Sequence, residues 1–181
     1  MRRLIPTLAI IALALTGCAS KAGTITTTEQ VTGQSFEEPR AKQKLAKESA
    51  STNPTFGDTY TWPDGLAVTI SEPEPLTLTN ELTADLYNLD AGDLLAFTVT
   101  IHNGTSEDVE AFAIITQMTS GSRESEAVFA TEDNIDMPTS TILPGKDLIW
   151  KVAYVVADPT DMQLTVNNMV DLDSAKVHFT N

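Results

Sequence analysis

The fold of this sequence is decided by a stretch of eight residues, Phe97-Thr98-Val99-Thr100-Ile101-His102-Asn103-Gly104. Its apolar residues stand at every second position, with threonine or histidine between them. Side chains of a β-strand point alternately to its two faces, so this pattern predicts a strand with one face buried and the other in water. The Asn-Gly pair that follows favours a tight turn where the strand ends.

The same period of two recurs along the chain from residue 56 onward. Leu148, Trp150, Val152 and Tyr154 alternate with Ile149, Lys151 and Ala153, which predicts the first set toward the core and the second toward solvent. The stretch 112–118 is apolar on both faces at its start and predicts a more buried strand. Together these patterns predict strands near residues 56–62, 65–72, 94–102, 111–118, 125–130, 147–156, 162–167 and 174–179.

Turn residues stand between these segments, and no amphipathic helix is predicted among them. Trp62-Pro63-Asp64-Gly65 and Leu143-Pro144-Gly145-Lys146 place Pro and Gly where type I and type II turns require them. The chain has a single cysteine, so stability must come from a packed core instead of an internal disulfide. Residues 55–181 therefore predict one all-β domain, an antiparallel sandwich of about seven or eight strands.

The first 17 residues have the pattern of a signal peptide. Met1-Arg2-Arg3 is positively charged, and residues 4–15 are largely apolar but too few to span a bilayer. Leu15-Thr16-Gly17-Cys18 resembles the bacterial lipobox, which implies cleavage before Cys18 and attachment of a diacylglyceryl group to its thiol. Two acyl chains hold a protein stably on a membrane. We therefore expect anchoring through lipid on Cys18, with no membrane-spanning segment.

Residues 18–54 are predicted to be the lipidated cysteine and a flexible tether. The segment is rich in Thr, Ser, Lys, Gln and Glu, and its few apolar residues cannot form a core. A flexible chain of this length has an end-to-end distance of about 35 Å. At full extension it reaches about 120–130 Å, enough to lift a domain clear of the bilayer.

Charge is distributed unevenly along the chain. Residues 56–181 hold 21 acidic residues against four basic ones (Arg123, Lys146, Lys151, Lys176), a net charge of −17. Nucleic acids and anionic lipid headgroups are bound through clusters of Lys and Arg. This composition excludes nucleic acid as a partner of the domain.

Several segments, taken in order, resemble those of a known family. "TFGDTYTWPDGLAVTISEPEP", "FTVTIHNGTSE", "GSRESEAVF" and "ILPGKDLIWKVAYVVADPTDMQLTV" are similar to actinobacterial lipoproteins with a DUF4352 domain. The resemblance covers residues 55–181 and includes the lipobox and tether before them. It implies an immunoglobulin-like sandwich on the cell surface, and it brings no catalytic or binding residues. The stretch "NELTADLYNLDAGD" has no counterpart in the resemblance.

Catalytic chemistry finds little support in the sequence. A Ser-His-Asp arrangement needs a histidine as base, and only His102 and His178 occur. Both alternate with apolar residues of their strands and are predicted to face solvent. No G-x-S-x-G, H-E-x-x-H or Gly-rich phosphate motif is present. We expect no catalytic residues, no cofactor and no enzyme activity.

Metal binding is a more specific alternative to catalysis. Calcium prefers carboxylate and carbonyl oxygens, and acidic residues gather in three predicted loops: Asp85, Asp90 and Asp93; Glu132, Asp133 and Asp136; Asp171 and Asp173. None of these has the EF-hand spacing, and acidic loops commonly serve solubility. Copper would use methionine and histidine, and Met118, Met137, Met162 and Met169 are available without a compact spacing. We interpret them as core-filling residues.

Two further features have simple interpretations. Trp62 and Trp150 could stack on a ligand, but each falls on the apolar side of the alternating pattern, which predicts core positions. Asn103-Gly104-Thr105 matches a glycosylation sequon, and we interpret it as turn chemistry.

The sequence thus predicts a lipoprotein on the extracytoplasmic face of the cell membrane, with an acidic immunoglobulin-like domain. Two functional classes remain open. One is a non-catalytic module that binds a protein or cell-wall partner, which would show an exposed apolar patch or a free strand edge. The other is a ligand- or calcium-binding protein that serves a membrane partner, which would show a pocket with convergent polar groups. An envelope enzyme is a weaker third.

Overall fold

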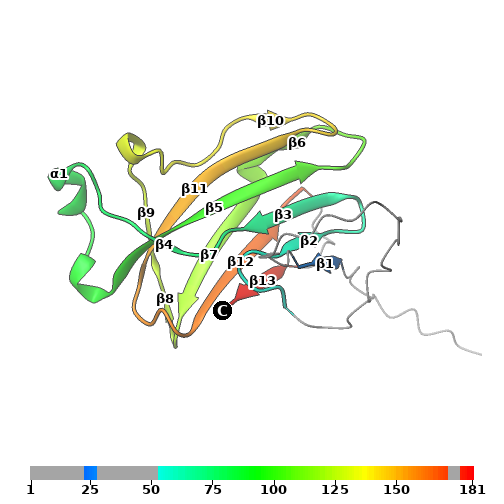
Figure 1. Cartoon of the computed structure of the whole chain (residues 1–181). Coiled ribbons are helices and arrows are strands. Elements are labelled where there is room, and N and C mark those ends of the chain that lie inside the picture. Colours follow the sequence, from blue (N-terminus) through cyan, green and yellow to red (C-terminus); the bar gives the residue numbers. More distant parts are fainter. Residues whose placement is uncertain (1–22, 28–52, 171–175) are drawn as a thin grey trace, which may run out of the picture.

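The computed structural model describes residues 23–27, 53–170 and 176–181 (Figure 1). The predicted signal peptide, Cys18 and most of the predicted tether lie outside these residues. No helix in the described part of the chain is both long enough and apolar enough to cross a membrane.

The strand that opens the sequence analysis is the centre of the larger sheet. It is β5 (Asp93–Asn103), and Phe97, Val99 and Ile101 are completely buried. It pairs antiparallel with β3 (Leu66–Ile70) on one side and with β11 (Asp147–Val156) on the other. In this register Val99 lies opposite Trp150 and Ile70, so inward-facing residues of three strands meet in one layer.

Two antiparallel sheets form the sandwich. The larger has the order β1 (Thr24–Thr26), β2 (Thr59–Thr61), β3, β5, β11 and β9 (Glu126–Val128), with β4 (Glu74–Pro75) also on β5. The smaller has the order β13 (Val177–Thr180), β12 (Met162–Asn168), β7 (Ile114–Ser120) and β8 (Arg123–Glu124). A short ribbon joins β10 (Thr141–Ile142) to β6 (Val109–Glu110).

The order of the strands is that of an immunoglobulin domain. Along the chain, β3, β5, β7, β9, β11, β12 and β13 take the places of strands A to G, so one sheet contains A-B-E-D and the other G-F-C. β8 extends the second sheet beside β7. The predicted antiparallel β-sandwich is therefore confirmed.

The main core lies between the two sheets. Leu66 and Phe97 from the larger sheet, and Trp62 from the turn between β2 and β3, pack toward Met118, Leu164 and Phe179 from the smaller sheet. All six are at most 1% exposed. Phe97 also makes a tilted ring contact with Phe56 and an edge-to-face contact with Tyr154. Burial of aromatic and branched side chains from both sheets holds the sandwich together.

A second apolar cluster covers the outer face of the larger sheet near β9. Ala96, Ala153 and Val155 are buried there against Val128, Ala130 and Ile135. Segment 76–94 packs around them through Leu76, Leu78, Tyr87, Leu89 and Leu94. It contains α1 (Glu81–Ala84) and η1 (Leu89–Ala91) (Figure 1). Ala153 was expected to face solvent, and that prediction is wrong because this segment covers it.

Two other expectations need correction. Phe112, predicted in a buried strand, lies 55% exposed in η2 (Ala111–Ala113), and the strand begins only at Ile114. Thr24–Thr26, in the predicted tether, forms a strand on β2 instead of a coil, and Ile25 packs against the main core. The hydroxyl of Tyr60 accepts a hydrogen bond from the Gly23 N–H at 2.6 Å, which holds the start of β1.

The predicted turns are present. Gly65 (φ +99°) and Gly145 (φ +72°) adopt the left-handed region, and Lys146 N–H donates to the Leu143 carbonyl at 3.0 Å.

Candidate functional site

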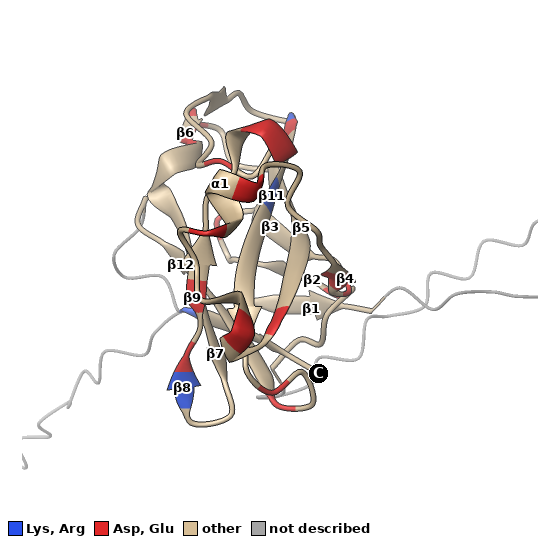
Figure 2. Ribbon diagram, turned by 90° about the vertical axis from the view of Figure 1, so that its left-hand side faces the viewer, with Lys and Arg blue, Asp and Glu red and all other residues tan. Residues whose placement is uncertain are grey.

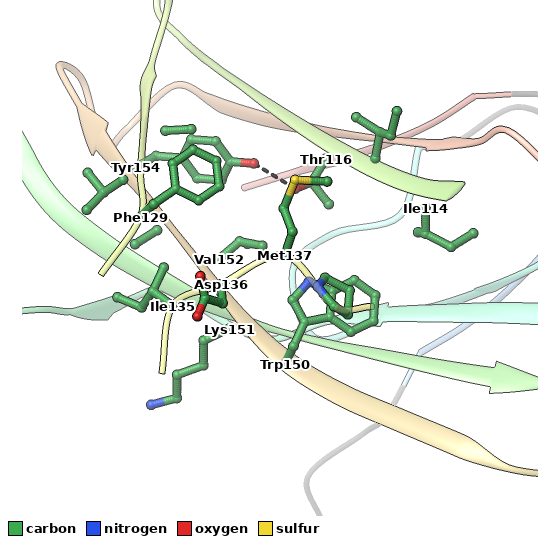
Figure 3. Close-up of a pocket in the computed structure, with 15 residues that line it drawn as sticks. Ile114, Thr116, Phe129, Ile135, Asp136, Met137, Trp150, Lys151, Val152 and Tyr154 are labelled. Atoms are coloured by element: carbon green, nitrogen blue, oxygen red, sulfur yellow. Dashed lines mark hydrogen bonds between the residues drawn. The ribbon is translucent and has the colours of Figure 1, made fainter. Parts of the chain in front are cut away.

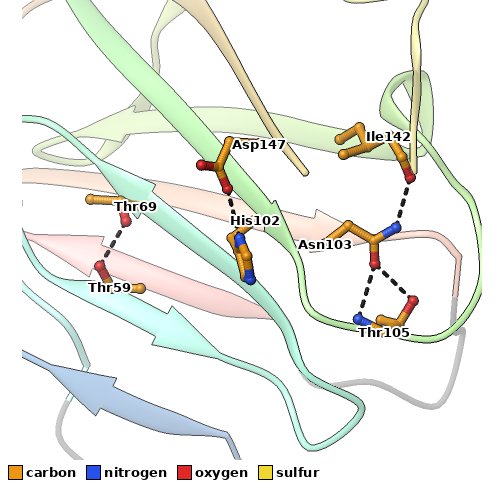
Figure 4. A network of polar contacts seen from close by, with 7 residues as sticks. All are labelled: Thr59, Thr69, His102, Asn103, Thr105, Ile142 and Asp147. Atoms are coloured by element: carbon orange, nitrogen blue, oxygen red, sulfur yellow. Dashed lines mark hydrogen bonds and ion pairs between the residues drawn. The ribbon is translucent and has the colours of Figure 1, made fainter. Parts of the chain in front are cut away.

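The two histidines lie on different sheets. His102 on β5 is exposed, and its Nδ1 lies 2.6 Å from Asp147 Oδ1 (Figure 4). His178 on β13 is half-buried, and its Nδ1 lies 2.9 Å from Thr165 Oγ1. The prediction of a solvent-facing side chain thus holds for His102 and only partly for His178.

Asn103 is buried, and its side-chain amide is fully hydrogen-bonded, within the turn and to β10. Its Nδ2 donates to the carbonyls of Glu107 and Ile142 at 2.8 and 2.7 Å, while Oδ1 accepts from the N–H and hydroxyl of Thr105 (Figure 4). The interpretation as turn chemistry is therefore confirmed, since the amide is neither exposed nor free.

In one of the acidic loops, the carboxylates accept hydrogen bonds from threonines of the same protein. Glu132 Oε1 accepts a hydrogen bond from Thr83 Oγ1 at 2.6 Å, and Asp133 accepts from both the N–H and the hydroxyl of Thr79. The Thr83 hydroxyl is the main reason that the pKa of Glu132 lies below its usual value. These bonds join η3 (Thr131–Asp133) to α1.

The other candidate ligands are dispersed. Asp85, Asp90 and Asp93 lie at the end of α1, in η1 and at the start of β5. Asp171 and Asp173 lie outside the described residues. In residues 23–27, 53–170 and 176–181, no three His, Cys, Asp or Glu side chains come together as a metal site requires. Met118 and Met162 are buried in the core, as predicted, whereas Met137 and Met169 are exposed.

A pocket opens at one edge of the sandwich, between β7 of the smaller sheet and β9 and β11 of the larger one. Its volume is about 180 Å³. Its walls come from residues 114–116, 127–129, 150–154 and the loop 135–138. Ile135 bridges to Lys151 where β9 has ended, so this loop continues the edge of the larger sheet beside β11.

Apolar and aromatic side chains form most of the pocket. Trp150, Val152 and Tyr154 line it from β11, and Phe129 and Met137 stand at its mouth with 52% and 55% of their surface exposed (Figure 3). Trp150 is half-buried and packs on the main core as well. The alternation of residues along β11 correctly predicted that the Trp150 side chain is directed into the sandwich, but the sandwich is open at that point.

Phe129 is exposed yet held in position. The hydroxyl of Tyr87 accepts a hydrogen bond from the Phe129 N–H at 2.8 Å and lies 3.0 Å from its carbonyl oxygen, to which it donates. Segment 76–94 therefore supports the wall of the pocket, because Tyr87 belongs to it. A wall fixed in advance lowers the entropic cost of binding.

A hydrogen-bonded pair marks the inner end of the pocket. Tyr154 Oη lies 2.7 Å from Thr116 Oγ1 and joins the two sheets (Figure 3). Burial raises the pKa of Tyr154 above its ordinary value, so the phenol remains a neutral donor at physiological pH.

A second, more polar hollow of about 380 Å³ adjoins the pocket and shares Thr116, Ala127 and Tyr154 with it. Gln117, Glu124 and Glu126 also line it. Ser125 lines it from the crossing between β8 and β9, and its buried hydroxyl has no hydrogen-bond partner among the described residues. We call these two adjoining hollows, one mainly apolar and the other lined by acidic residues, the edge groove.

Sequence reasoning did not identify the edge groove. Trp150 was considered only with Trp62, which is buried in the core. Phe129 and Met137 lie in short irregular segments, where no period shows which way a side chain points. The one available signal was Met137, a large apolar residue in a loop expected to be polar. Phe129 was expected in the strand 125–130, and β9 ends one residue before it.

Neither the family models nor the curated proteins that were compared match this sequence. Among solved structures, yjhA from Bacillus subtilis superposes with a TM-score of 0.53 at 17% identity, covering 70% of this chain and 98% of yjhA. That likeness shows the fold. The Bacillus subtilis protein ycdA, described as a candidate lipoprotein, superposes with a TM-score of 0.49 at 17% identity. The match covers 65% of this chain and 36% of ycdA.

Proposed function

We propose that this chain is a lipoprotein of the extracytoplasmic face of the cell membrane, whose immunoglobulin-like domain is a non-catalytic binding module. Leu15-Thr16-Gly17-Cys18 after a charged and apolar leader supports lipidation of Cys18. We also propose that the chain is related to the actinobacterial-type lipoproteins with a DUF4352 domain that it resembles. The domain then acts outside the cytoplasm, held by acyl chains on Cys18.

The observation that carries the binding role is the edge groove. Exposed Phe129 and Met137 stand over a concave apolar pocket, with Trp150 and Tyr154 inside it. Aromatic residues at the mouth of a pocket are typical of binding surfaces. The non-catalytic part of the proposal is supported by the histidines, since neither His102 nor His178 lines the groove.

Lipidation is tested by labelling growing cells with an alkyne analogue of palmitate. The full-length chain should incorporate the label and partition into detergent, and Cys18→Ser should lose both properties. Ser20→Ala is the matched control and should retain both. Label on the Cys18→Ser chain would contradict the lipidation of Cys18.

The binding role is tested with N-acetyltryptophanamide, an uncharged probe, and residues 18–181 carrying Cys18→Ser, which contain every described element. NMR titration should give saturable shifts at Ala127, Val128 and Tyr154. Phe129→Ala combined with Met137→Ala should weaken binding several-fold. The matched control is Phe112→Ala with Leu143→Ala, because those side chains are similarly exposed (55% and 53%) but lie elsewhere. Equal losses in both pairs would contradict a role of the groove.

A further inference from the structure

We propose that the edge groove binds a segment of a partner polypeptide that presents one aromatic side chain next to basic residues. The aromatic ring enters the apolar pocket, and the basic residues lie along the acidic hollow. This inference rests on the binding role proposed above and adds the chemical class of the partner.

The size of the pocket fits one aromatic side chain. A buried apolar cavity of about 150 Å³ binds benzene, whereas sites for drug-sized ligands have about 300–1,000 Å³. The pocket has about 180 Å³. It therefore accommodates one aromatic side chain and is too small for a cofactor or another large ligand.

The shape of the groove favours a chain over an isolated ring. Thr116 and Tyr154 line both the pocket and the polar hollow of about 380 Å³, so the two lie next to each other. A polypeptide that places one side chain in the pocket can extend its neighbouring residues through that hollow. Binding energy concentrated in one buried aromatic anchor, with polar contacts around it, is the usual arrangement of protein interfaces.

The acidic lining of the edge groove favours basic residues beside the aromatic side chain of the partner. Glu124 and Glu126 line the hollow and Asp136 lines the pocket, and none of them forms an ion pair within the described part of the chain. Lys151 is the single cation of the groove, and its amine points away from Phe129, Met137 and Trp150 (Figure 3). Elsewhere in the domain as well, acidic residues outnumber basic ones along the ribbon (Figure 2). A basic segment is attracted to this groove, and an acidic one is repelled.

The same chemistry disfavours the two nearest alternative occupants. The only aromatic residue between Ala19 and Thr55 is Phe36, which is followed by Glu37 and Glu38. A second copy of the domain would bring another net charge of −17 against the groove. Residues 19–55 have a net charge of +1, but their one aromatic side chain lies next to two carboxylates and four residues from the nearest basic residue, Arg40. The second copy has the wrong charge overall, so a separate basic partner fits best.

The test uses four capped pentapeptides and residues 18–181 carrying Cys18→Ser. They are Gly-Lys-Trp-Lys-Gly, Gly-Ser-Trp-Ser-Gly, Gly-Glu-Trp-Glu-Gly and Gly-Lys-Ala-Lys-Gly, and dissociation constants come from NMR titration at low salt. Exposed ion pairs each contribute little, so we expect the basic Trp peptide to bind about tenfold more tightly than the acidic one. The Ala peptide should not shift the pocket residues.

Charge reversal gives the matched variants. Glu124→Lys with Glu126→Lys should remove or invert the preference for the basic peptide. Glu74→Lys with Asp108→Lys changes the net charge equally at exposed positions away from the groove and should preserve that preference. All four residues are exposed, so none of these changes disturbs the core.

The outcomes separate the two proposals. If neither N-acetyltryptophanamide nor any Trp peptide shifts the pocket residues, the binding role itself is wrong. If the uncharged probe binds but the three Trp peptides bind equally, the binding role stands and the basic partner is wrong. Equal binding of the Ala and Trp basic peptides would show general electrostatic adhesion and overturn the aromatic anchor. Peptides no tighter than the single-residue probe would indicate a small aromatic ligand.

Discussion

Ser125 and Ser120 are both buried, at 9% and 2% exposure, but their hydroxyls have opposite surroundings. Ser120 Oγ accepts a hydrogen bond from the Asp158 N–H at 2.6 Å and donates to the Asp158 carbonyl at 3.0 Å. Ser125 Oγ has no partner in the described residues. Replacing both residues by alanine therefore removes a satisfied hydroxyl in one case and an unsatisfied one in the other.

The two alanine variants should change stability in opposite directions. Ser120→Ala leaves the Asp158 main chain unpaired and should lower the free energy of unfolding by about 1–3 kcal/mol. Ser125→Ala removes a group whose burial is unfavourable and should raise it by up to about 1 kcal/mol. Urea unfolding of residues 18–181 carrying Cys18→Ser measures both. Equal destabilisation would mean that Ser125 is satisfied by a bound water.

At this scale the sequence predicted the direction of side chains but not their accessibility. The period of two placed Phe97, Val99 and Ile101 in the core correctly, because a strand allows only two directions. It could not show that Trp150, directed inward in the same way, lies where the sandwich is open. That depends on how far β9 and β7 extend beside β11, a property of the assembled sheets.

Among the elements, η3 and α1 are joined by acidic side chains that resemble a cation site in sequence. Glu132 and Asp133 instead bind Thr83 and Thr79. The pKa of Glu132 is lowered in the folded chain, mainly by the Thr83 hydroxyl. A lowered folded pKa stabilises the protein above the unfolded pKa, and this contribution is lost as the pH falls through the folded value.

Glu132→Gln should therefore reduce the acid sensitivity of the domain. Between pH 5 and pH 3 the wild-type chain should lose more stability than the variant, because only the wild-type chain has a carboxylate at position 132 that becomes protonated. Thermal unfolding of both chains across this range measures the difference. Glu74→Gln is the control, since Glu74 is exposed and accepts no side-chain hydrogen bond from the described residues. Parallel pH curves for all three chains would contradict the role of the Thr83 bond.

β1 depends on a close approach at Gly23. A Cβ at this position would overlap the Thr61 carbonyl oxygen and the Tyr60 ring. Gly23→Ala should therefore release β1 from β2 and increase hydrogen exchange at the β2 amides that face it. Thr24→Ala, at an exposed neighbouring position, should leave exchange unchanged. Protection that survives Gly23→Ala would show that β1 can shift to accommodate the methyl group.

The longer strands were predictable, and most of the shortest ones were not. All eight predicted segments contain or overlap an observed strand, but two of those strands, β2 and β9, have only three residues, so their length was overestimated. β1, β4, β6, β8 and β10 have only two or three residues each and were not predicted, since pairing with a neighbour, and not local pattern, determines them. Segment 76–94 was also unpredicted, since its apolar residues follow the outer face of a sheet rather than a period of their own.

For the molecule as a whole, the high negative charge raises the question of calcium. The described carboxylates form no group suited to a metal. We expect calcium and magnesium at the same millimolar concentration to change the melting temperature of residues 18–181 carrying Cys18→Ser equally, through screening alone. A specific site occupied at 100 times its dissociation constant would add about 2.7 kcal/mol, a shift of several degrees. Such a calcium-selective shift, absent with EDTA, would contradict this expectation.

If Cys18 carries lipid as proposed, the strand order of the larger sheet gives the molecule a membrane-proximal and a membrane-distal edge. β1 forms one edge and β9, beside the edge groove, forms the other. Six strands at about 4.8 Å spacing separate these edges by about 24 Å. Cys18 precedes Thr24 by six residues, a reach of at most about 20 Å. With lipid on Cys18 and β1 in place, the long tether no longer sets the height of the domain. The sheet itself then acts as the spacer and carries the groove away from the lipid, toward whatever approaches the cell from outside.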